Sequence, residues 1–167
     1  PRFLEAARLM SRQRQDLRFV LPAVPAQQDR IQQLVARAGL DAAVQVTRGG
    51  SHVALAACDV TLIASGTATL EAALFKRPMV IAYHMNWLSW KLHQRKMLQP
   101  WVGLPNILAG DFLVPELLQE AATPAALARE TLAWLADDPA TRARREALHQ
   151  RFSAMHRELT RDTVKQA

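Results

Sequence analysis

Apolar residues recur every three or four positions in several stretches of this chain, and short runs of consecutive apolar residues lie between them. The first pattern predicts amphipathic helices, and the second predicts strands. Within the first 110 residues, helices are expected at 1–14, 27–38, 51–57, 67–75 and 86–99. Strands are expected at 17–21, 44–46, 60–64 and 79–83, with a last short strand at 106–108. Two further helices are expected at 124–136 and 139–160.

Strand and helix alternate throughout this first part of the chain. Strands that are apolar throughout, rather than at every second residue, are typical of a parallel sheet covered by helices on both faces. The expected fold class is therefore α/β: a Rossmann-like, doubly wound parallel sheet with C-terminal helices. Pro22 is expected to end the first strand, and Gly39 the second helix. We expect one domain over 1–136, incomplete at its N-terminus, and a basic C-terminal helix over 137–167 that packs on it or crosses from it.

The composition is that of a folded domain with an anionic partner. The 167 residues suffice for one core, and 50% hydrophobic with 22% charged residues excludes a disordered chain. The net charge of +6 favours a phosphate, a nucleotide, a nucleic acid or a membrane surface as partner. A single cysteine, Cys58, excludes a disulfide framework. Because helical sequence begins directly at Pro1, we expect the chain to be a piece of a longer protein.

The most informative stretch is the end of the apolar run 60–64, where Ser65-Gly66-Thr67 leads at once into a helix. Ligands of open α/β sheets bind at the carboxyl ends of the strands. The first turn of the helix offers unpaired N–H groups and a positive dipole end, which suit phosphate oxygens. Gly66 permits close approach to the backbone, and Ser65, Thr67 and Thr69 offer hydroxyl groups.

Glu71 lies one helical turn after Thr67, on the same face of the expected helix. An ionised carboxylate only accepts hydrogen bonds, so it suits two neighbouring sugar hydroxyls and not a phosphate. Phosphate at the helix tip and ribose at Glu71 would together accommodate a nucleotide. A capped helix that carries an ordinary surface glutamate explains the same pattern.

Two further stretches carry polar groups of interest. Asn106, in the run 104–110, has donors and an acceptor that need partners if it is buried, although a turn asparagine after a proline is the simpler interpretation. Residues 84–101 combine tryptophans with basic residues and contain no acid, which suits a membrane interface or an acylated substrate. The candidates for lipid contact are Trp87, Trp90, Lys91, Arg95, Lys96 and Trp101. The alternative is that these tryptophans belong to the core.

Other chemistry is not indicated. The histidines His52, His84, His93, His149 and His156 lack the Cys or carboxylate spacing of a metal site, so no metal is expected. Cys58 is interpreted as a packing residue. Aromatic residues make up 6% of the chain and no nucleic-acid motif is present, so no nucleic-acid partner is expected.

Four runs together resemble the bacterial lipid-A-disaccharide synthase family. In order along the chain they are ASGTATLE (64–71), RPMVIAYHM (77–85), LPNILAG (104–110) and VPELLQE (114–120). One departure is His84, where the family pattern has Arg, so a permanent positive charge is not expected there. The resemblance covers most of this chain but about half of a family member, and it places a Gly-Ser-Arg loop just before Pro1.

The resemblance implies the C-terminal, donor-binding half of a two-domain GT-B enzyme of glycosyltransferase family 19. The implied reaction is the inverting transfer of 2,3-diacylglucosamine from UDP-2,3-diacylglucosamine to 2,3-diacylglucosamine 1-phosphate, which gives the β-1,6 lipid A disaccharide 1-phosphate and UDP, without metal or cofactor. By carry-over, Ser65, Gly66 and Thr67 face the phosphates, Glu71 the ribose and Asn106 the donor pocket. The catalytic acid/base belongs to the family's N-terminal half, so this chain alone is expected to be inactive.

The implied substrates are acylated and anionic, so the protein is expected as a peripheral protein on the cytoplasmic face of the inner membrane of a Gram-negative bacterium. Surface lipids are expected partners, and a homodimer is a possible assembly. The enzyme alternatives are a peptidoglycan-precursor N-acetylglucosaminyltransferase and a UDP-sugar epimerase. The non-enzymatic alternative is a peripheral membrane-binding module in which the Ser-Gly-Thr turn is only structural.

Overall fold

The structure is a computed structural model that describes residues 1–85 and 99–165, with side chains up to residue 161. The helices are α1 (Arg2–Gln13), α2 (Gln28–Arg37), α3 (Ser51–Ala57), α4 (Thr67–Leu74), α6 (Leu104–Ala109), α7 (Pro124–Trp134) and α8 (Pro139–Lys165). The strands are β1 (Phe19–Ala23), β2 (Val44–Arg48), β3 (Thr61–Ala64), β4 (Met79–Tyr83) and β5 (Glu116–Leu118). Single 3-10 turns lie at Pro25–Gln27 and Gln119–Ala121. The helix expected at 86–99 falls outside the described residues except for residue 99.

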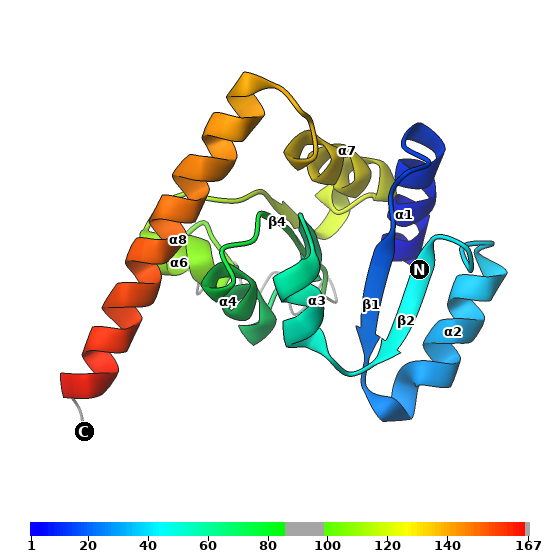
Figure 1. Cartoon of the computed structure of the whole chain (residues 1–167), viewed down its shortest axis with the longest axis horizontal. Coiled ribbons are helices and arrows are strands. Elements are labelled where there is room, and N and C mark those ends of the chain that lie inside the picture. The colour runs from blue at the N-terminus through cyan, green and yellow to red at the C-terminus, as the bar shows by residue number, and fades with distance from the viewer. Residues whose placement is uncertain (86–98, 166–167) are drawn as a thin grey trace.

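The described strands form two parallel sheets. In the first, β1 pairs with β2, from Phe19 beside Val44 to Ala23 beside Arg48. In the second, β4 lies between β3 and β5. Figure 1 shows the β1–β2 pair and α8 on opposite sides of the molecule. The expected α/β class with parallel strands is confirmed.

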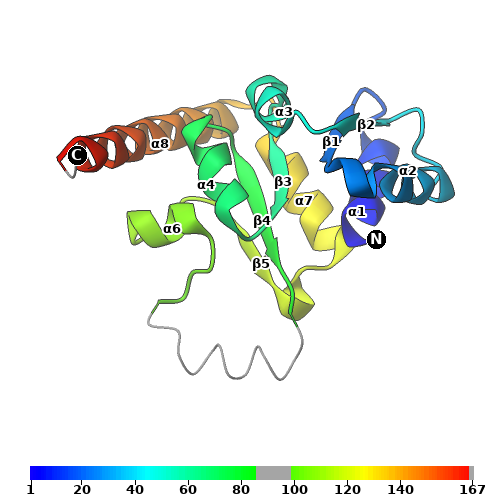
Figure 2. The ribbon, with the colours of Figure 1, turned by 90° about the horizontal axis from the view of Figure 1, so that it is seen from below.

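The core is centred on β4, whose residues Met79, Val80 and Ile81 are fully buried. α4 packs on β3, and α7 packs on both β3 and β4; Figure 2 shows these two helices on opposite sides of the three-stranded sheet. Successive side chains of a strand point to opposite faces, so a wholly apolar strand needs cover on both. β4 has that cover, whereas Val20 of β1 is 49% exposed.

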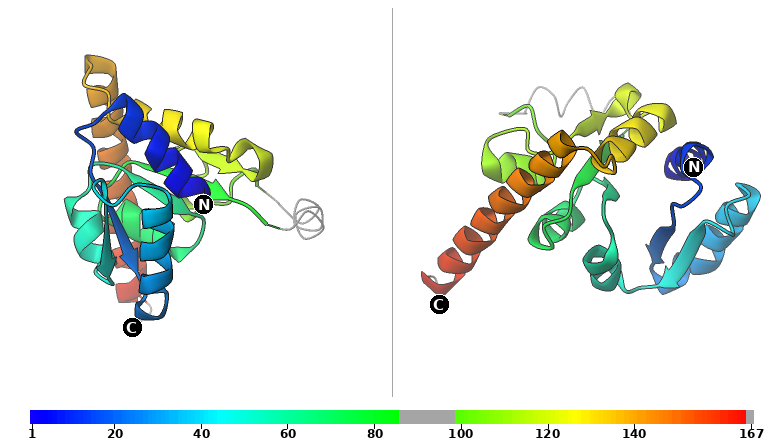
Figure 3. Two further views of the ribbon diagram at one scale, coloured as in Figure 1. Left: turned by 90° about the vertical axis from the view of Figure 1, so that its right-hand side faces the viewer. Right: turned by 45° about the horizontal axis from the view of Figure 1, so that its top comes forward.

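Two long-range helix contacts complete the core. α1 packs against α7, with Ala6 and Met10 buried, and this contact joins the β1–β2 pair to the rest of the fold. α8 packs against α4, α6 and α7 and buries Leu148, Phe152 and Met155. Figure 3 shows the C-terminal end of α8 extending past the helices beside it.

The strand expected at 106–108 is wrong, because these residues lie within α6. Pro105 is in the first turn of this helix, where proline is tolerated. Gly110 ends the helix in the left-handed conformation, at φ 62°, which glycine adopts without strain. A short apolar run between Pro105 and Gly110 is compatible with a short helix as well as with a strand. The apolar run alone therefore does not distinguish the two.

The prediction that Pro22 ends the first strand is also wrong, because β1 continues to Ala23. The Phe19 N–H donates to Ala43 O on the β2 side, so the nitrogen of Pro22, three residues on, faces the other edge of β1. Among the described strands that edge is unpaired, and an edge position tolerates the missing proline N–H.

Candidate functional site

The turn between β3 and α4 forms the tip of the candidate site. Gly66 adopts φ 157° and ψ −170°, a conformation that other residues rarely take, and a Cβ there would meet no atom within 4 Å. Gly66, Thr67 and Ala68 are exposed, and no side chain caps the start of α4. Backbone N–H groups at a helix start with a positive dipole end are suited to an anion. The open, conformationally constrained tip therefore fits the sequence-based expectation for phosphate.

Two of the tip hydroxyls serve the protein itself. Thr69 is fully buried and donates from Oγ1 to the Gly66 carbonyl oxygen at 2.7 Å. Ser65 donates from Oγ to the Val102 carbonyl oxygen at 2.9 Å, which ties the tip to the segment before α6. Thr67 is left as the exposed hydroxyl of the turn. Thr69 thus supports the backbone that a ligand would meet and does not form its surface.

Glu71 lies one turn into α4 with its side chain 42% exposed. Its Oε2 is 3.3 Å from Nε2 of His52, at the start of α3, and the His52 ring lies 5.6 Å from the Phe75 ring. α3 and α4 both follow the carboxyl ends of parallel strands, and Figure 1 shows them side by side. The structure thus adds His52 to the site, where the sequence indicated only an isolated histidine.

A signal for His52 does exist in the sequence. It follows Gly49-Gly50 directly after β2, in the same strand–turn–helix arrangement that marks Ser65–Thr67 after β3. In an α/β fold with parallel strands, the helices that follow the strands begin on the same side of the fold, so this pattern would have placed both turns on one side.

Asn106 is fully buried at the start of α6, and all four of its hydrogen-bonding positions are occupied. Its amide nitrogen donates to Val114 O at 2.9 Å and to Glu116 Oε1 at 2.8 Å. Its Oδ1 accepts from the N–H groups of Leu113 at 2.9 Å and Val114 at 3.1 Å. An asparagine saturated in this way has no group left for a ligand. The structure therefore gives Asn106 a supporting role behind the site.

Glu116 at the start of β5 is the centre of this network. Besides Asn106, its carboxylate accepts from the N–H groups of Val102 at 2.8 Å and Gly103 at 3.0 Å. Hydrogen bonds to an ionised carboxylate are short and strong. We call Glu116, Asn106 and Val102–Gly103 the carboxylate clamp; through Val102 it connects to Ser65 at the tip.

The remaining candidates are the proposed lipid-contact residues and His84. Trp87, Trp90, Lys91, Arg95 and Lys96 lie outside the described residues, so their lipid contact stays a prediction. Trp101 is partly buried, and its ring meets that of the exposed Phe112 edge-on at 5.7 Å. His84 is exposed directly after β4. Within residues 1–85 and 99–161 no group of three metal-ligating side chains gathers, and no described helix is long and apolar enough to span a membrane.

Comparison with known proteins places this arrangement in a family. The profile of lipid-A-disaccharide synthetase matches residues 1–167. The chain belongs to the lipid-A-disaccharide synthetase family. It is 56% identical to a lipid-A-disaccharide synthase of Albidiferax ferrireducens over 99% of its length, and 57% identical to that of Thiobacillus denitrificans over 93%. It is 50% identical to the synthase of Pseudomonas savastanoi over 99% of its length.

The chain spans about two fifths of the length of these lipid-A-disaccharide synthases, with 43%, 41% and 41% of them covered. The four family runs meet in space where they are described. The tip run 64–71 joins the turn before α6 through Ser65 and Val102, and the runs 104–110 and 114–120 join through Asn106 and Glu116. The run 77–85 contains β4, between the strands of the other runs. The family resemblance thus corresponds to one connected region at the carboxyl ends of β3 and β4.

Proposed function

We propose that this chain is the donor-binding part of a lipid A glycosyltransferase. Its reaction is the transfer of 2,3-diacylglucosamine from UDP-2,3-diacylglucosamine to 2,3-diacylglucosamine 1-phosphate, with β-1,6 disaccharide 1-phosphate and UDP as products. Membership of the lipid-A-disaccharide synthetase family supports this reaction. The observation that carries the donor role is the exposed Gly66–Ala68 tip with Glu71 one turn away, at the carboxyl end of a parallel strand.

The tip and Glu71 bind different parts of the nucleotide. The N–H groups of the first turn of α4, with the Thr67 hydroxyl, receive the diphosphate, because fixed dipoles oriented toward an anion lose no energy to reorganisation. Glu71 accepts from the ribose hydroxyls. When the sugar departs, negative charge develops on the diphosphate, and the tip stabilises it. This is the catalytic contribution of this part of the enzyme, with the acid/base supplied from outside the chain.

The tip fits a diphosphate that needs no metal in this part of the site. Its donors are backbone N–H groups and a hydroxyl, and the nearest carboxylate, Glu71, is a single one with His52 beside it. A divalent cation prefers several oxygen ligands, carboxylates above all. The proposed location is the cytoplasmic face of the inner membrane, with surface lipids held by the tryptophans and cations of 87–101.

UDP binding to the full-length protein tests the donor role. We expect calorimetric titration to show saturable UDP binding, and Glu71→Gln to weaken it roughly ten- to a hundredfold, which corresponds to the ~1.5–3 kcal/mol of a hydrogen bond to a charged group. Glu130→Gln is the matched control, because Glu130 lies on α7 and pairs only with the neighbouring Arg129 in the described structure. No UDP binding, or equal affinities for the Glu71 and Glu130 variants, would overturn the assignment.

We also propose that the two sheets are parts of one doubly wound sheet. The edge of β1 away from β2 presents the N–H and C=O of Val20, and the edge of β3 away from β4 presents those of Leu62 and Ala64. One parallel strand that ends just before α1 would pair with both edges and give the order β2-β1-strand-β3-β4-β5, with right-handed crossovers. The relatives have the additional length to supply it.

Hydrogen exchange tests this arrangement. Amide protons of Val20, Leu62 and Ala64 should exchange at least tenfold more slowly in the full-length protein than in the isolated chain 1–167. Val80 in β4, which already has strands on both sides, is the internal reference and should change far less. Equal protection of the three edge amides in both proteins would contradict a strand at this position.

A further inference from the structure

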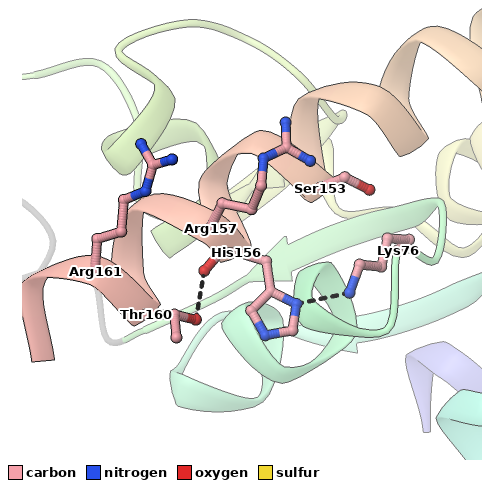
Figure 4. A pocket seen from close by; sticks show the side chains of 6 residues that line it. All are labelled: Lys76, Ser153, His156, Arg157, Thr160 and Arg161. Carbon is pink, nitrogen blue, oxygen red and sulfur yellow. Dashed lines mark hydrogen bonds between the residues drawn. The ribbon is translucent and has the colours of Figure 1, made fainter. Parts of the chain in front are cut away.

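A concave site lies at the opposite end of α4 from the candidate donor site. It is an open pocket of about 470 Å³ between the turn after α4 and the C-terminal part of α8 (Figure 4). This volume is within the range of ~300–1,000 Å³ typical of small-molecule sites. Its lining, which we call the α8 pocket, consists of Lys76, Ser153, His156, Arg157, Thr160 and Arg161. α4 is eight residues long, about 12 Å, so the α8 pocket and the Gly66 tip are separate.

The lining is basic, and its arginines have no carboxylate partner among the described side chains. Among residues 1–85 and 99–161, the lining holds one Lys, two Arg and one His, and no carboxylate. Arg157 and Arg161 form no ion pair with any carboxylate of the described side chains, whereas Arg142 and Arg151 of the same helix approach Asp137 and Asp111. Arg157 and Arg161 are four residues apart, so two like charges lie on neighbouring turns, which is unfavourable without a counter-charge. An anion between them would remove that repulsion.

Lys76 is held in place at the wall of the pocket. It adopts φ 57°, a left-handed conformation unusual for a residue with a side chain. Its ammonium donates to Leu74 O at 2.6 Å and to Nδ1 of His156 at 2.7 Å. Figure 4 shows this side chain reaching from the turn after α4 to His156 on α8. A lysine ammonium has three protons, so one donor remains for a ligand.

His156 adds a second donor through the same contact. Because the ammonium of Lys76 can only donate, Nδ1 of His156 accepts, and the ring proton is on Nε2. The hydroxyl group of Ser153 also lines the pocket, whereas that of Thr160 donates to the His156 carbonyl oxygen at 2.8 Å (Figure 4). Cationic and neutral hydrogen-bond donors, in a pocket whose described lining holds no carboxylate, can bind phosphate oxygens.

We propose that the α8 pocket binds a phosphate group, independently of the nucleotide at the tip. Arg157 and Arg161 supply the charge that contacts the phosphate. Lys76 and His156, which Figure 4 shows on a different side of α8 from the two arginine side chains, add positive charge and a donor at the wall of the pocket. The phosphate is either that of a soluble phosphorylated molecule or that of an anionic phospholipid headgroup, and the same groups would recognise both.

Titration with inorganic phosphate tests the site in the full-length protein. We expect saturable binding at 0.15 M salt and a loss of at least tenfold in the double variant Arg157→Gln/Arg161→Gln. The matched control is Arg142→Gln/Arg151→Gln, which removes the same charge from the same helix outside the pocket. It should change phosphate affinity less than twofold, and UDP affinity should stay unchanged in both. Absence of saturable phosphate binding, or equal losses in the two double variants, would overturn the proposal.

Vesicles identify the source of the phosphate. Phosphatidylcholine vesicles with and without phosphatidylglycerol are offered to the same variants. If the pocket variant binds the anionic vesicles more weakly than the control variant, the ligand is a headgroup. If the two variants bind vesicles equally while inorganic phosphate binding is lost in the pocket variant alone, the ligand is soluble. Each of these results supports the pocket.

Discussion

β1 and β4, one from each sheet of this protein, are both apolar strands but differ in how deeply they are buried. β4 has a strand on each side and helices over both faces, and four of its five residues are buried. β1 pairs with one strand, and its Val20 is 49% exposed. An apolar strand is suited to a buried position. How deeply it is buried in this structure depends on the strands and helices that pack beside it. The strand that we propose between β1 and β3 would reduce this difference.

The largest expected effect concerns β4, the central strand of the three-stranded sheet. Ile81→Ala should lower the free energy of unfolding by about 2–5 kcal/mol, because it leaves a cavity in a site with no exposure. Val20→Ala in the isolated chain should cost about 0.5 kcal/mol or less, because half of that side chain is already in water. Urea denaturation of both variants measures the contrast. A Val20 loss as large as that of Ile81 would show that the two sheets do not differ in this way.

The variants Val20→Ala and Ile81→Ala should differ less in the full-length protein. If a strand lies against β1, Val20 becomes more buried, and Val20→Ala should cost about 1 kcal/mol more there than in the isolated chain. The Ile81→Ala cost should stay the same in the two proteins. A Val20 cost that is equal in both would contradict the strand proposal without touching the donor site.

An effect smaller than that of Ile81→Ala is expected at the carboxylate clamp. Glu116→Gln keeps the size of the side chain but replaces one acceptor oxygen with a donor, which cannot bond to both the Val102 and Gly103 N–H groups. We expect a loss of about 1–3 kcal/mol in stability and weaker UDP binding, since Val102 also holds Ser65. Denaturation and UDP titration measure the two. Leu118→Met, also in β5, is the control and should leave UDP affinity unchanged.

Gly103→Ala tests how tightly the carboxylate clamp packs against β4. A Cβ at this position would overlap with Cδ1 of Ile81 and lie 2.9 Å from Oε1 of Glu116. Since Ile81 is fully buried, it has little room to move, and we expect a loss of about 1–3 kcal/mol from overpacking. Gly49→Ala meets no atom within 4 Å, so it reports the cost of its positive φ alone. Equal melting temperatures for the wild type and Gly103→Ala would contradict this tight contact.

The smallest expected effect is electrostatic and concerns Asp16, between α1 and β1. Hydrogen bonds from Arg14, just before β1, lower the pKa of Asp16 to about 2. A carboxyl group whose pKa is lowered by folding stabilises the protein above its unfolded pKa of 3.8, and this contribution disappears as the pH falls toward 2. Both side chains are largely exposed, so Asp16→Asn should cause a small fall in melting temperature at pH 7. The fall should shrink in 1 M salt and vanish near pH 2.

Local patterns predicted much of the fold. The bounds of β4 and α3 and the starts of α4, α7 and α8 follow from apolar runs and from glycine and proline signals, which act over a few residues. β5 was missed because a three-residue strand is too short to show periodicity. Pro22 and residues 106–108 were misassigned because an unpaired strand edge and a helix between two glycines depend on surroundings that an apolar run does not encode.

The candidate site was predicted where its chemistry is local. Gly66, Thr67 and Glu71 are close in sequence, and the strand–turn–helix pattern placed them together. His52, Glu116 and the roles of Asn106 and Thr69 depend on which groups meet across the fold. A polar residue in an apolar run indicates that it needs partners, but it does not distinguish a ligand from a backbone carbonyl.

The contact between α1 and α7 has a consequence for the synthesis of the protein. Arg14, directly after α1, donates to the Leu135 carbonyl oxygen at the end of α7, 121 residues further along the chain. At roughly 5–20 residues per second, a ribosome needs about 6–24 seconds to make that interval. During this time the apolar face of α1 has emerged without the helix that will cover it. The nascent chain therefore offers chaperones a binding segment whose lifetime is set by translation speed.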